Sequence, residues 1–184
     1  HTMSALFSGF FIEGRREGKG RQVFSDGCAY DGEWKADTFS GNGILSLASG
    51  SVYNGVWRGG KMCGHGSFTC VGDGNDGGSL WEGQWCEGER QGKGQLSLRD
   101  GSVVSGLWEG NAWAGGSARI VYGNGSGVYE GSVVAETWQR QGRGVWRGSN
   151  GEVYEGDWVS DQRCGHGQWT HQLRTYTGDF CDNL

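Results

Sequence analysis

The sequence predicts an all-β protein, an elongated single-layer antiparallel sheet of consecutive β-hairpin repeats with a period of about 23 residues. Three observations predict it. Residues 30–43 (YDGEWKADTFSGNG) and 154–167 (YEGDWVSDQRCGHG) carry Tyr, Gly, Trp, Gly and Gly at identical offsets. Large and small residues alternate within these stretches, as they do on one face of a strand. Glycine makes up 39 of the 184 residues, and pairs such as Asp26-Gly27 mark turns between the stretches.

Copies of the pattern aromatic-x-Gly-x-aromatic, followed by Gly-x-Gly, repeat along the chain. They begin at residues 7, 30, 53, 81, 104, 129, 154 and 176, so the spacing varies from 22 to 28 residues, and the longer copies carry insertions such as GDGNDGG at 72–78. We assign residues 7–184 to the repeat array, with a partial last copy. Residues 1–6 are interpreted as a tag remnant and leader. The array begins and ends in repeat register, as a fragment of a longer array would.

Each copy is expected to form one hairpin. In the first strand, Tyr30, Gly32 and Trp34 share a face, and the intervening acidic residues share the other. In the second strand, within 41–47, two glycines share a face with two leucines. Aromatic rings can lie flat across such glycines and stack on rings of the next copy, so burial of aromatic surface offsets the cost of glycine in a strand.

A row of aromatic side chains is predicted to form the core and to floor a groove for protein partners. A one-layer sheet cannot cover its own apolar face completely, and exposed aromatic surface marks binding sites. The alternative is simple stacking within the core, and the two are compatible. The predicted groove aromatics are Tyr30, Trp34, Tyr53, Trp57, Trp81, Trp85, Trp108, Tyr129, Tyr154 and Trp158.

Composition and charge exclude several classes of function. The net charge of −5 disfavours nucleic acid as a partner, because phosphate binding needs clustered Lys and Arg. No apolar run approaches the roughly 18 residues of a transmembrane helix. No catalytic triad, nucleophile elbow or paired carboxylate motif stands out, so we predict no enzymatic activity and no cofactor. The protein is expected inside the cell, in the cytoplasm.

The motif YxGxW followed by GxG, at a period of about 23 residues, resembles the membrane occupation and recognition nexus (MORN) repeat. This resemblance covers nearly the whole chain. It implies an extended β-hairpin solenoid without catalytic activity, of the kind found in junctional membrane proteins, lipid kinases, ciliary spokes and parasite cytoskeletal scaffolds. Such repeats form grooves for partner helices, dimerisation surfaces and, as long thought, phospholipid sites.

Some positions depart from the repeat pattern. Val104 and Val133 replace aromatics, and Ser117 replaces the second glycine of GxG. A turn glycine is also replaced at Asp37, Asn111 and Asp161. We therefore expect the fifth and sixth copies to be the least regular, and to bend or widen the array.

A basic stretch near the N-terminus is a candidate site for phospholipid headgroups. It contains Arg15, Arg16, Lys19 and Arg21 within a glycine-rich segment that lacks the spacing of a phosphate-binding loop. Phosphoinositide contact is one interpretation, and solvated hairpin tips are the simpler one.

Cysteine and histidine recur at one repeat position. Cys63 and His65 match Cys164 and His166, and residues two apart on a strand point the same way. Zinc needs four ligands, so two such pairs from two chains could form an intermolecular site, for which Cys164 and His166 are the stronger candidates. Alternatively the residues are incidental. The six cysteines are expected to be free intracellular thiols.

These observations favour a non-enzymatic scaffold at a structure where membrane and cytoskeleton meet. It is expected to self-associate as a dimer, because an open sheet exposes strand edges, and to bind protein partners along the groove. Two alternatives stay open: a phospholipid-binding module, and the regulatory repeat segment of a larger enzyme.

Overall fold

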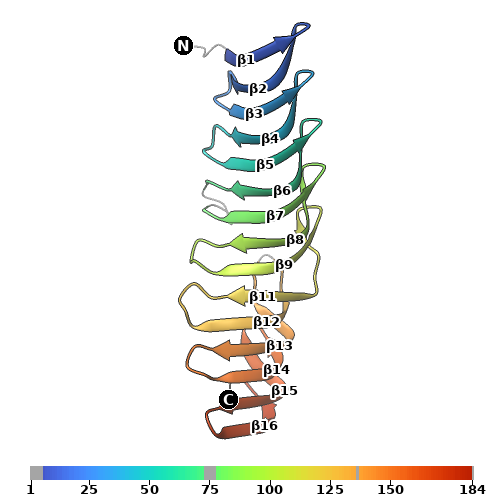
Figure 1. Ribbon diagram of the computed structural model, residues 1–184. Helices are drawn as coiled ribbons and strands as arrows, with labels where there is room; N and C mark the ends of the chain where they lie inside the picture. The colour runs from blue at the N-terminus through green and yellow to red at the C-terminus, as the bar shows by residue number, and fades with distance from the viewer. Residues whose placement is uncertain (1–5, 73–77, 136, 184) are drawn as a thin grey trace. The chain divides into compact units, whose positions relative to one another are not determined.

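The computed structural model describes residues 6–72, 78–135 and 137–183, and all regular structure in them is β. One antiparallel sheet contains the strands in chain order, with β10 paired to β9 beside the main path (Figure 1). This confirms the predicted class and the hairpin architecture. The strands are β1 Leu6–Ile12, β2 Arg15–Val23, β3 Ala29–Lys35, β4 Thr38–Ser46, β5 Val52–Arg58, β6 Lys61–Thr69, β7 Leu80–Cys86, β8 Glu89–Ser97, β9 Val103–Glu109, β10 Ala112–Trp113, β11 Ser117–Val121, β12 Gly127–Val133, β13 Arg140–Gly148, β14 Val153–Val159, β15 Gln162–His171 and β16 Arg174–Phe180.

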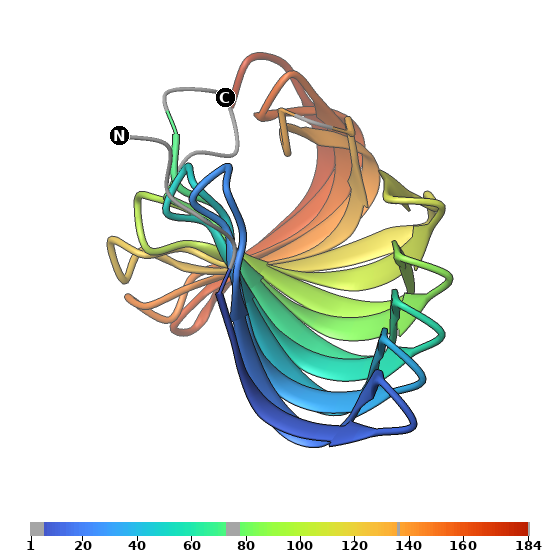
Figure 2. The same cartoon turned by 90° about the horizontal axis from the view of Figure 1, so that it is seen from above.

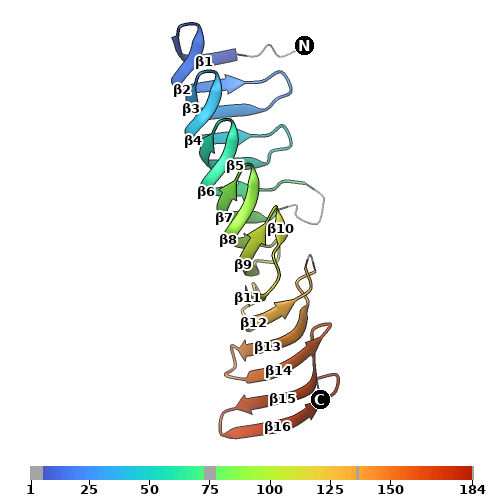
Figure 3. The same ribbon diagram turned by 90° about the vertical axis from the view of Figure 1, so that its right-hand side faces the viewer.

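The chain forms two compact units, residues 1–94 and 95–184. Within the first, β1 to β7 pair with their sequence neighbours, and each strand is rotated relative to the one before it (Figure 2). The connections β2–β3 and β4–β5 lie on one side of this ladder (Figure 3). Residues 1–5 of the expected leader, and 73–77 of the glycine-rich insertion, lie outside the described residues.

Tight turns close the hairpins. In β3–β4, Ala36 and Asp37 both have positive φ, 46° and 66°, which is the pattern of the type I′ turn that suits the twist of paired strands. Gly59 and Gly60 close β5–β6 in the same way, with φ of 56° and 77°. The backbone N–H of Gly60 then donates to the carbonyl of Phe39 in the preceding hairpin at 3.0 Å, so consecutive turns are joined directly.

The two glycines of each GxG have different functions. Gly41 has φ of 55°, and the register with β3 shifts beside it, so this glycine supplies a left-handed β-bulge. Gly43 keeps extended geometry but lies under the phenol ring of Tyr30, and a Cβ there would overlap the ring carbons and hydroxyl. Of the two glycines, only Gly43 therefore lies flat beneath a ring, as predicted from the sequence. Gly41 bends the strand instead.

Aromatic rings connect successive hairpins above this floor. The Tyr30 ring packs edge-to-face with Trp34 and with Trp57, at centroid distances of 5.2 and 5.5 Å. The indole N–H of Trp57 donates to the carbonyl of Gly43 at 3.0 Å. Trp34, Trp85 and Trp158 make the same bond to Gly20, Gly66 and Gly144. Each tryptophan therefore anchors its own hairpin to the one before it.

The fifth copy breaks the pattern, as expected from its sequence. Its second strand is divided into β10 and β11 by residues 114–116, and Val104 occupies the tyrosine position. The Trp113 ring covers Gly106 in place of the missing phenol, since a Cβ on Gly106 would overlap that ring. No helix able to span a membrane occurs among residues 6–72, 78–135 and 137–183.

Candidate functional site

The ten aromatics predicted to floor a partner groove are buried inside the chain. Their exposed fractions range from 0% for Tyr30, Tyr129 and Tyr154 to 7% for Trp85. Their rings are therefore occupied by one another and by the glycine backbone. A role for them in gripping a partner stays a prediction, and it would act through ring edges rather than ring faces.

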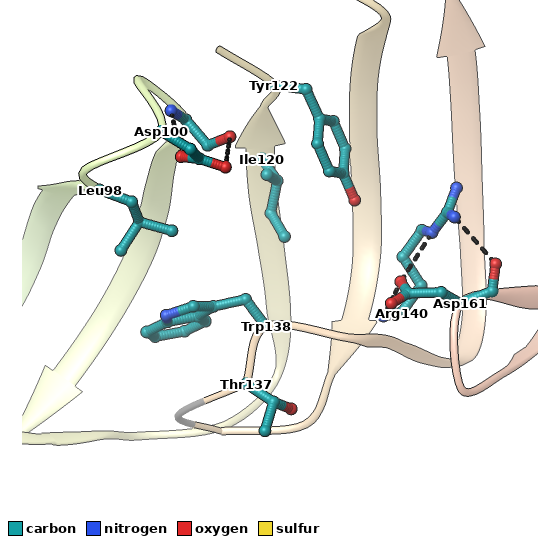
Figure 4. Close-up of a pocket in the computed structure, with 9 residues that line it drawn as sticks. Leu98, Asp100, Ile120, Tyr122, Thr137, Trp138, Arg140 and Asp161 are labelled. Atoms are coloured by element: carbon teal, nitrogen blue, oxygen red, sulfur yellow. Dashed lines mark hydrogen bonds and ion pairs between the residues drawn. The ribbon is translucent and has the colours of Figure 1, made fainter. Parts of the chain in front are cut away.

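A pocket opens where the sequence departs from the repeat. It encloses about 270 Å³ in the second unit, and Figure 4 shows most of its lining side chains. Leu98 and Ile120 provide apolar surface, and Tyr122 and Trp138 provide two aromatic rings. The full lining is Leu98, Asp100, Ser102, Ile120, Tyr122, Thr137, Trp138, Arg140 and Asp161.

Two rings of the regular array are missing from the core cluster that contains the pocket's apolar residues. Val104 stands at a tyrosine position and Val133 at a tryptophan position, so two of the largest side chains of the regular array are absent here. Two other tryptophans partly replace them. Trp113 and Trp138 pack edge-to-face at 5.4 Å, and both contact Trp108, at 5.8 and 5.9 Å. Trp138 comes from the inserted loop before β13, where its φ is 58°.

The polar wall of the pocket is formed by an ion pair. The Arg140 Nε lies 3.0 Å from Asp161 Oδ1, and one guanidinium nitrogen donates to the Asp161 carbonyl at 2.8 Å. The same guanidinium lies over the Trp158 ring, 4.1 Å from its centroid. This arginine is held on two sides by its own chain, which fixes the shape of the wall.

The remaining polar groups are arranged at the rim. Asp100 accepts hydrogen bonds from the Ser102 N–H at 2.8 Å and hydroxyl at 3.0 Å. Tyr122 packs edge-to-face on Trp146 at 5.4 Å, and burial raises the pKa of its phenol while Arg140 opposes that shift. Among the residues that the structure describes, the Tyr122 hydroxyl has no hydrogen-bond partner, and it points into the pocket (Figure 4). It is a neutral group that can donate to a ligand.

The Arg140–Asp161 pair has a counterpart in the first unit. Arg16 Nε lies 2.9 Å from Asp37 Oδ1, and its guanidinium lies 4.1 Å from the Trp34 ring centroid. The Arg16 N–H and guanidinium hold the pKa of Asp37 below its ordinary value. We call this arrangement the Arg–Asx bridge: an arginine near the start of a second strand, and an acidic or amide residue in the next hairpin turn. It explains why Asp37 and Asp161 replace turn glycines.

The basic stretch proposed for lipid headgroups does not form one cationic surface. Arg16 is bound to Asp37 on the aromatic side of β2. Lys19 and Arg21 are exposed, but Glu33 and Asp31 lie directly opposite them on β3. Arg15 is exposed near the turn. Phospholipid contact at these four residues stays a prediction, and acidic neighbours weaken its electrostatic basis.

The cysteine and histidine pairs lie on the strands where the sequence placed them. Gly64 and Gly165, between the two members of each pair, are bulge glycines with φ of 61° and 53°. His166 Nδ1 lies 3.3 Å from Asp179 Oδ1. Within the described parts of the chain, no three His, Cys, Asp or Glu side chains converge on a metal site. A zinc site between two chains, built from Cys164 and His166 or from Cys63 and His65, stays a prediction.

The sequence analysis missed the pocket residues. Tyr122 and Trp138 do not occupy the repeated aromatic positions, so a search for the repeat passes over them. The signal that could have found them was the pair of departures at Val104 and Val133, read together with extra aromatics nearby. Where smaller side chains replace aromatic rings in a repeated core, space is left, and other aromatic residues nearby are candidates to line it.

Comparison with one solved structure supports the fold, and a second, weaker likeness is given beside it. The TCP domain of SAS-4 (dCPAP) from Drosophila melanogaster, solved in complex with a proline-rich motif of Ana2 (dSTIL), aligns with a TM-score of 0.53 at 10% identity, over 87% of this chain and 83% of that one. The TCP10 domain of Danio rerio CPAP, in complex with a STIL peptide, aligns with a TM-score of 0.46 at 13% identity, over 96% and 94%. No curated protein sequence matches the chain.

Comparison with family models identifies the repeat itself. The MORN repeat model matches residues 7–29, 30–52, 53–74, 81–103 and 154–171, which together are more than half of the chain. Five of the eight repeat starts read from the sequence coincide with these matches, and the irregular fifth and sixth copies are not matched. MORN repeats are generally non-enzymatic interaction modules, and no catalytic family is indicated. The chain therefore belongs to the MORN repeat family.

Proposed function

We propose that this chain is a non-enzymatic scaffold that binds an extended, proline-containing protein segment in the pocket between Leu98 and Trp138. The single observation that carries the proposal is the pocket in the part of the core where Val104 and Val133 stand in place of aromatic residues. The ten aromatics of the row are buried, whereas Tyr122 and Trp138 border a space of about 270 Å³. That space is slightly below the roughly 300–1,000 Å³ of typical small-molecule sites, and it suits one or two side chains of a peptide.

The chemistry of the lining favours proline over other residues. Aromatic rings set side by side receive the flat pyrrolidine ring of a polyproline II segment, and hydroxyl or indole N–H groups at the rim donate to its free carbonyls. Tyr122 offers both a ring and an unused hydroxyl. A residue with its own side-chain N–H groups inside the pocket would instead compete with Arg140 for Asp161.

The charge of the lining adds a second requirement. Asp100, Asp161 and Arg140 give the pocket one net negative charge, because Arg140 neutralises only one carboxylate. A lysine or arginine flanking the prolines would pair with Asp100. The Drosophila TCP domain, which has a similar fold, was solved with a proline-rich motif, and this supports a β-sheet surface of this kind as a platform for such a peptide.

Replacing Trp138 by alanine is expected to weaken binding of a labelled proline-rich peptide carrying a flanking arginine. The loss should exceed about tenfold in Kd, because an aromatic anchor at the centre of an interface contributes about 2 kcal/mol. Fluorescence anisotropy would measure it. Trp169→Ala is the matched control, since the Trp169 indole bonds Glu152 away from the pocket. Equal affinity of the Trp138 variant and the wild type would contradict the proposal.

We also propose that the scaffold self-associates, and the edge strand β1 supports this. Its side chains Leu6, Phe10, Phe11 and Ile12 are 67%, 73%, 58% and 61% exposed, and among the described residues β1 pairs with β2 alone. The assembly would bring partners together inside the cell, at a membrane or cytoskeletal structure. Phospholipid binding through the basic stretch, or service as a regulatory segment of a larger enzyme, are the alternatives.

Light scattering after size exclusion is expected to show a dimer, twice the 19.9 kDa chain mass. Phe10→Lys should convert it to a monomer, because a charge in an apolar edge contact is unpaired when buried. Addition of a chelator then decides the zinc prediction. Dissociation of the dimer by the chelator alone would support an intermolecular metal site. A monomer at every protein concentration would contradict self-association.

A further inference from the structure

Four of the six cysteines lie one residue beyond the last paired residues of two strand pairs. In β6–β7 the paired register ends with Gly64 and Trp85, so its continuation by one residue would set Cys63 opposite Cys86. In β15–β16, Gly165 faces Phe180, and the next step places Cys164 opposite Cys181. Each pair lies within one compact unit. The partner that the sequence analysis assigned to each first cysteine was the histidine two residues along, but the sheet brings a second cysteine to it.

Directly opposed residues of an antiparallel ladder point to the same face of the sheet. Their Cα atoms are about 4.5 or 5.5 Å apart, depending on whether the pair is hydrogen-bonded. A disulfide needs Cα atoms about 4.4–6.8 Å apart, so either spacing is within reach. All six cysteines are free thiols in this structure, Cys86 and Cys181 are exposed, and Cys63 and Cys164 are half-buried.

Contacts at the same position in other hairpins show that side chains there reach the backbone at the end of the neighbouring strand. Glu17 lies next to Gly18, which pairs with Trp34, and it accepts a hydrogen bond from the Ala36 N–H at 2.9 Å. Gln141 lies next to Gly142, which pairs with Trp158, and it accepts one from the Ser160 N–H at 3.2 Å. The first side chain therefore reaches the end of the opposing strand in both cases. Consistent with this, Cys181 and Asp182 are among the charges that raise the pKa of Cys164, after burial and Asp157.

We propose that Cys63–Cys86 and Cys164–Cys181 are two reversible dithiol sites that oxidise to intrachain disulfides across the joints between repeats. The oxidant class is a small-molecule disulfide, such as oxidised glutathione. The exposed thiolate of Cys181 or Cys86 attacks it, forms a mixed disulfide and releases one glutathione thiolate. The facing cysteine, as its thiolate, then displaces the second glutathione. Two protein thiols and one glutathione disulfide become one protein disulfide and two glutathione thiols.

The position of the pairs determines what oxidation would do. Both bridges connect the second strand of one hairpin to the first strand of the next, rather than the two strands of one hairpin. Each would close a chain loop of modest length and restrict its unfolded states. In the reduced chain neighbouring hairpins can separate by local unfolding. After oxidation, the strand pairs β6–β7 and β15–β16 would be held together covalently.

The test is to expose the reduced, folded chain to a glutathione redox buffer, trap remaining thiols with iodoacetamide, and map them by mass spectrometry. Four thiols are expected to disappear with a mass loss of about 4 Da, two hydrogens for each disulfide, while Cys28 and Cys70 stay alkylated. Trypsin separates Cys164 from Cys181 by cutting after Arg174. Cys63, Cys70 and Cys86 share one tryptic peptide, so Cys70→Ser removes that ambiguity without touching either pair.

Single-serine variants provide the matched controls. Cys63→Ser and Cys164→Ser are each expected to leave the facing cysteine as a stable glutathione mixed disulfide, with the other pair unaffected. Oxidation of the urea-unfolded chain should lose the pairing preference, because the sheet sets it. Six alkylated thiols after oxidation, bridges that include Cys28 or Cys70, or disulfides between chains would each overturn the proposal.

Discussion

Raising the pH from about 10 to 12 is expected to unfold this chain, because three buried tyrosines resist ionisation in the folded state. Tyr30, Tyr53 and Tyr129 are 0%, 1% and 0% exposed, and burial raises the pKa of each phenol to about 12. In the unfolded chain the pKa is about 10. A raised pKa in the folded state means that this stability is fully present below about pH 10 and is lost as the pH rises toward 12.

The expected effect is large. A shift of about two pKa units corresponds to roughly 3 kcal/mol, so the three tyrosines together account for several kcal/mol at high pH. That is comparable with the whole free energy of unfolding of a typical domain, about 5–15 kcal/mol. Chemical unfolding at a series of alkaline pH values, together with tyrosinate absorbance, would measure both the stability and the ionisation.

Tyr53→Phe is the variant that isolates one phenol. It keeps the ring but removes the hydroxyl that donates to the Val56 carbonyl at 3.1 Å. Its stability should fall less steeply above pH 10 than that of the wild type, since one fewer proton is released on unfolding. Ionisation of all tyrosines near pH 10, with the sheet intact, would contradict the expectation.

Replacing Trp57 by alanine is expected to lower the free energy of unfolding by about 3–5 kcal/mol. The indole is 5% exposed and packs on Tyr30, Tyr53 and Phe39, with centroid distances between 5.0 and 5.5 Å. Its N–H also holds the Gly43 carbonyl of the preceding hairpin. Alanine removes both the filled volume and the bond between hairpins.

Hydrogen exchange would show where this loss acts. In an array whose hairpins contact mainly their neighbours, protection should fall first in β3 to β6 and less in β1. Trp57→Phe is the control, because it keeps most of the ring and should cost about 1–2 kcal/mol through the lost N–H donor. Similar losses for alanine and phenylalanine would mean that the bond, and not the ring, holds the hairpins together.

The regular part of the fold was predictable because one physical pattern is repeated. Tyr, Gly and Trp at alternate positions identify the first strand of each hairpin, and the following Gly-x-Gly identifies the second strand. The division of labour between Gly41 and Gly43 was not predictable, because both are compatible with an extended strand until the register shift is seen. The aromatic row was expected to form the core, and it does. Its burial is so complete, however, that little ring surface is left for a partner to contact.

The candidate site could be predicted only in part, for a different reason. Val104 and Val133 mark the irregular copies, but Trp138 reaches the pocket from an inserted loop whose path no periodicity describes. The facing cysteines were also hidden in the sequence, because the distances from Cys63 to Cys86 and from Cys164 to Cys181 along the chain differ. Only the strand register shows that the two pairs are equivalent.

The Arg–Asx bridge limits how an array of this kind can change over generations. Repeats are gained and lost by duplication and deletion of whole units, which is harmless only if any unit can follow any other. Loss of residues 30–52 would bring Arg16 to the turn of Gly59 and Gly60, which offers no carboxylate, and would leave its cation without an anion. Neighbouring units with such a bridge are therefore expected to be inherited as matched pairs, and shuffled arrays to retain their order at these joints.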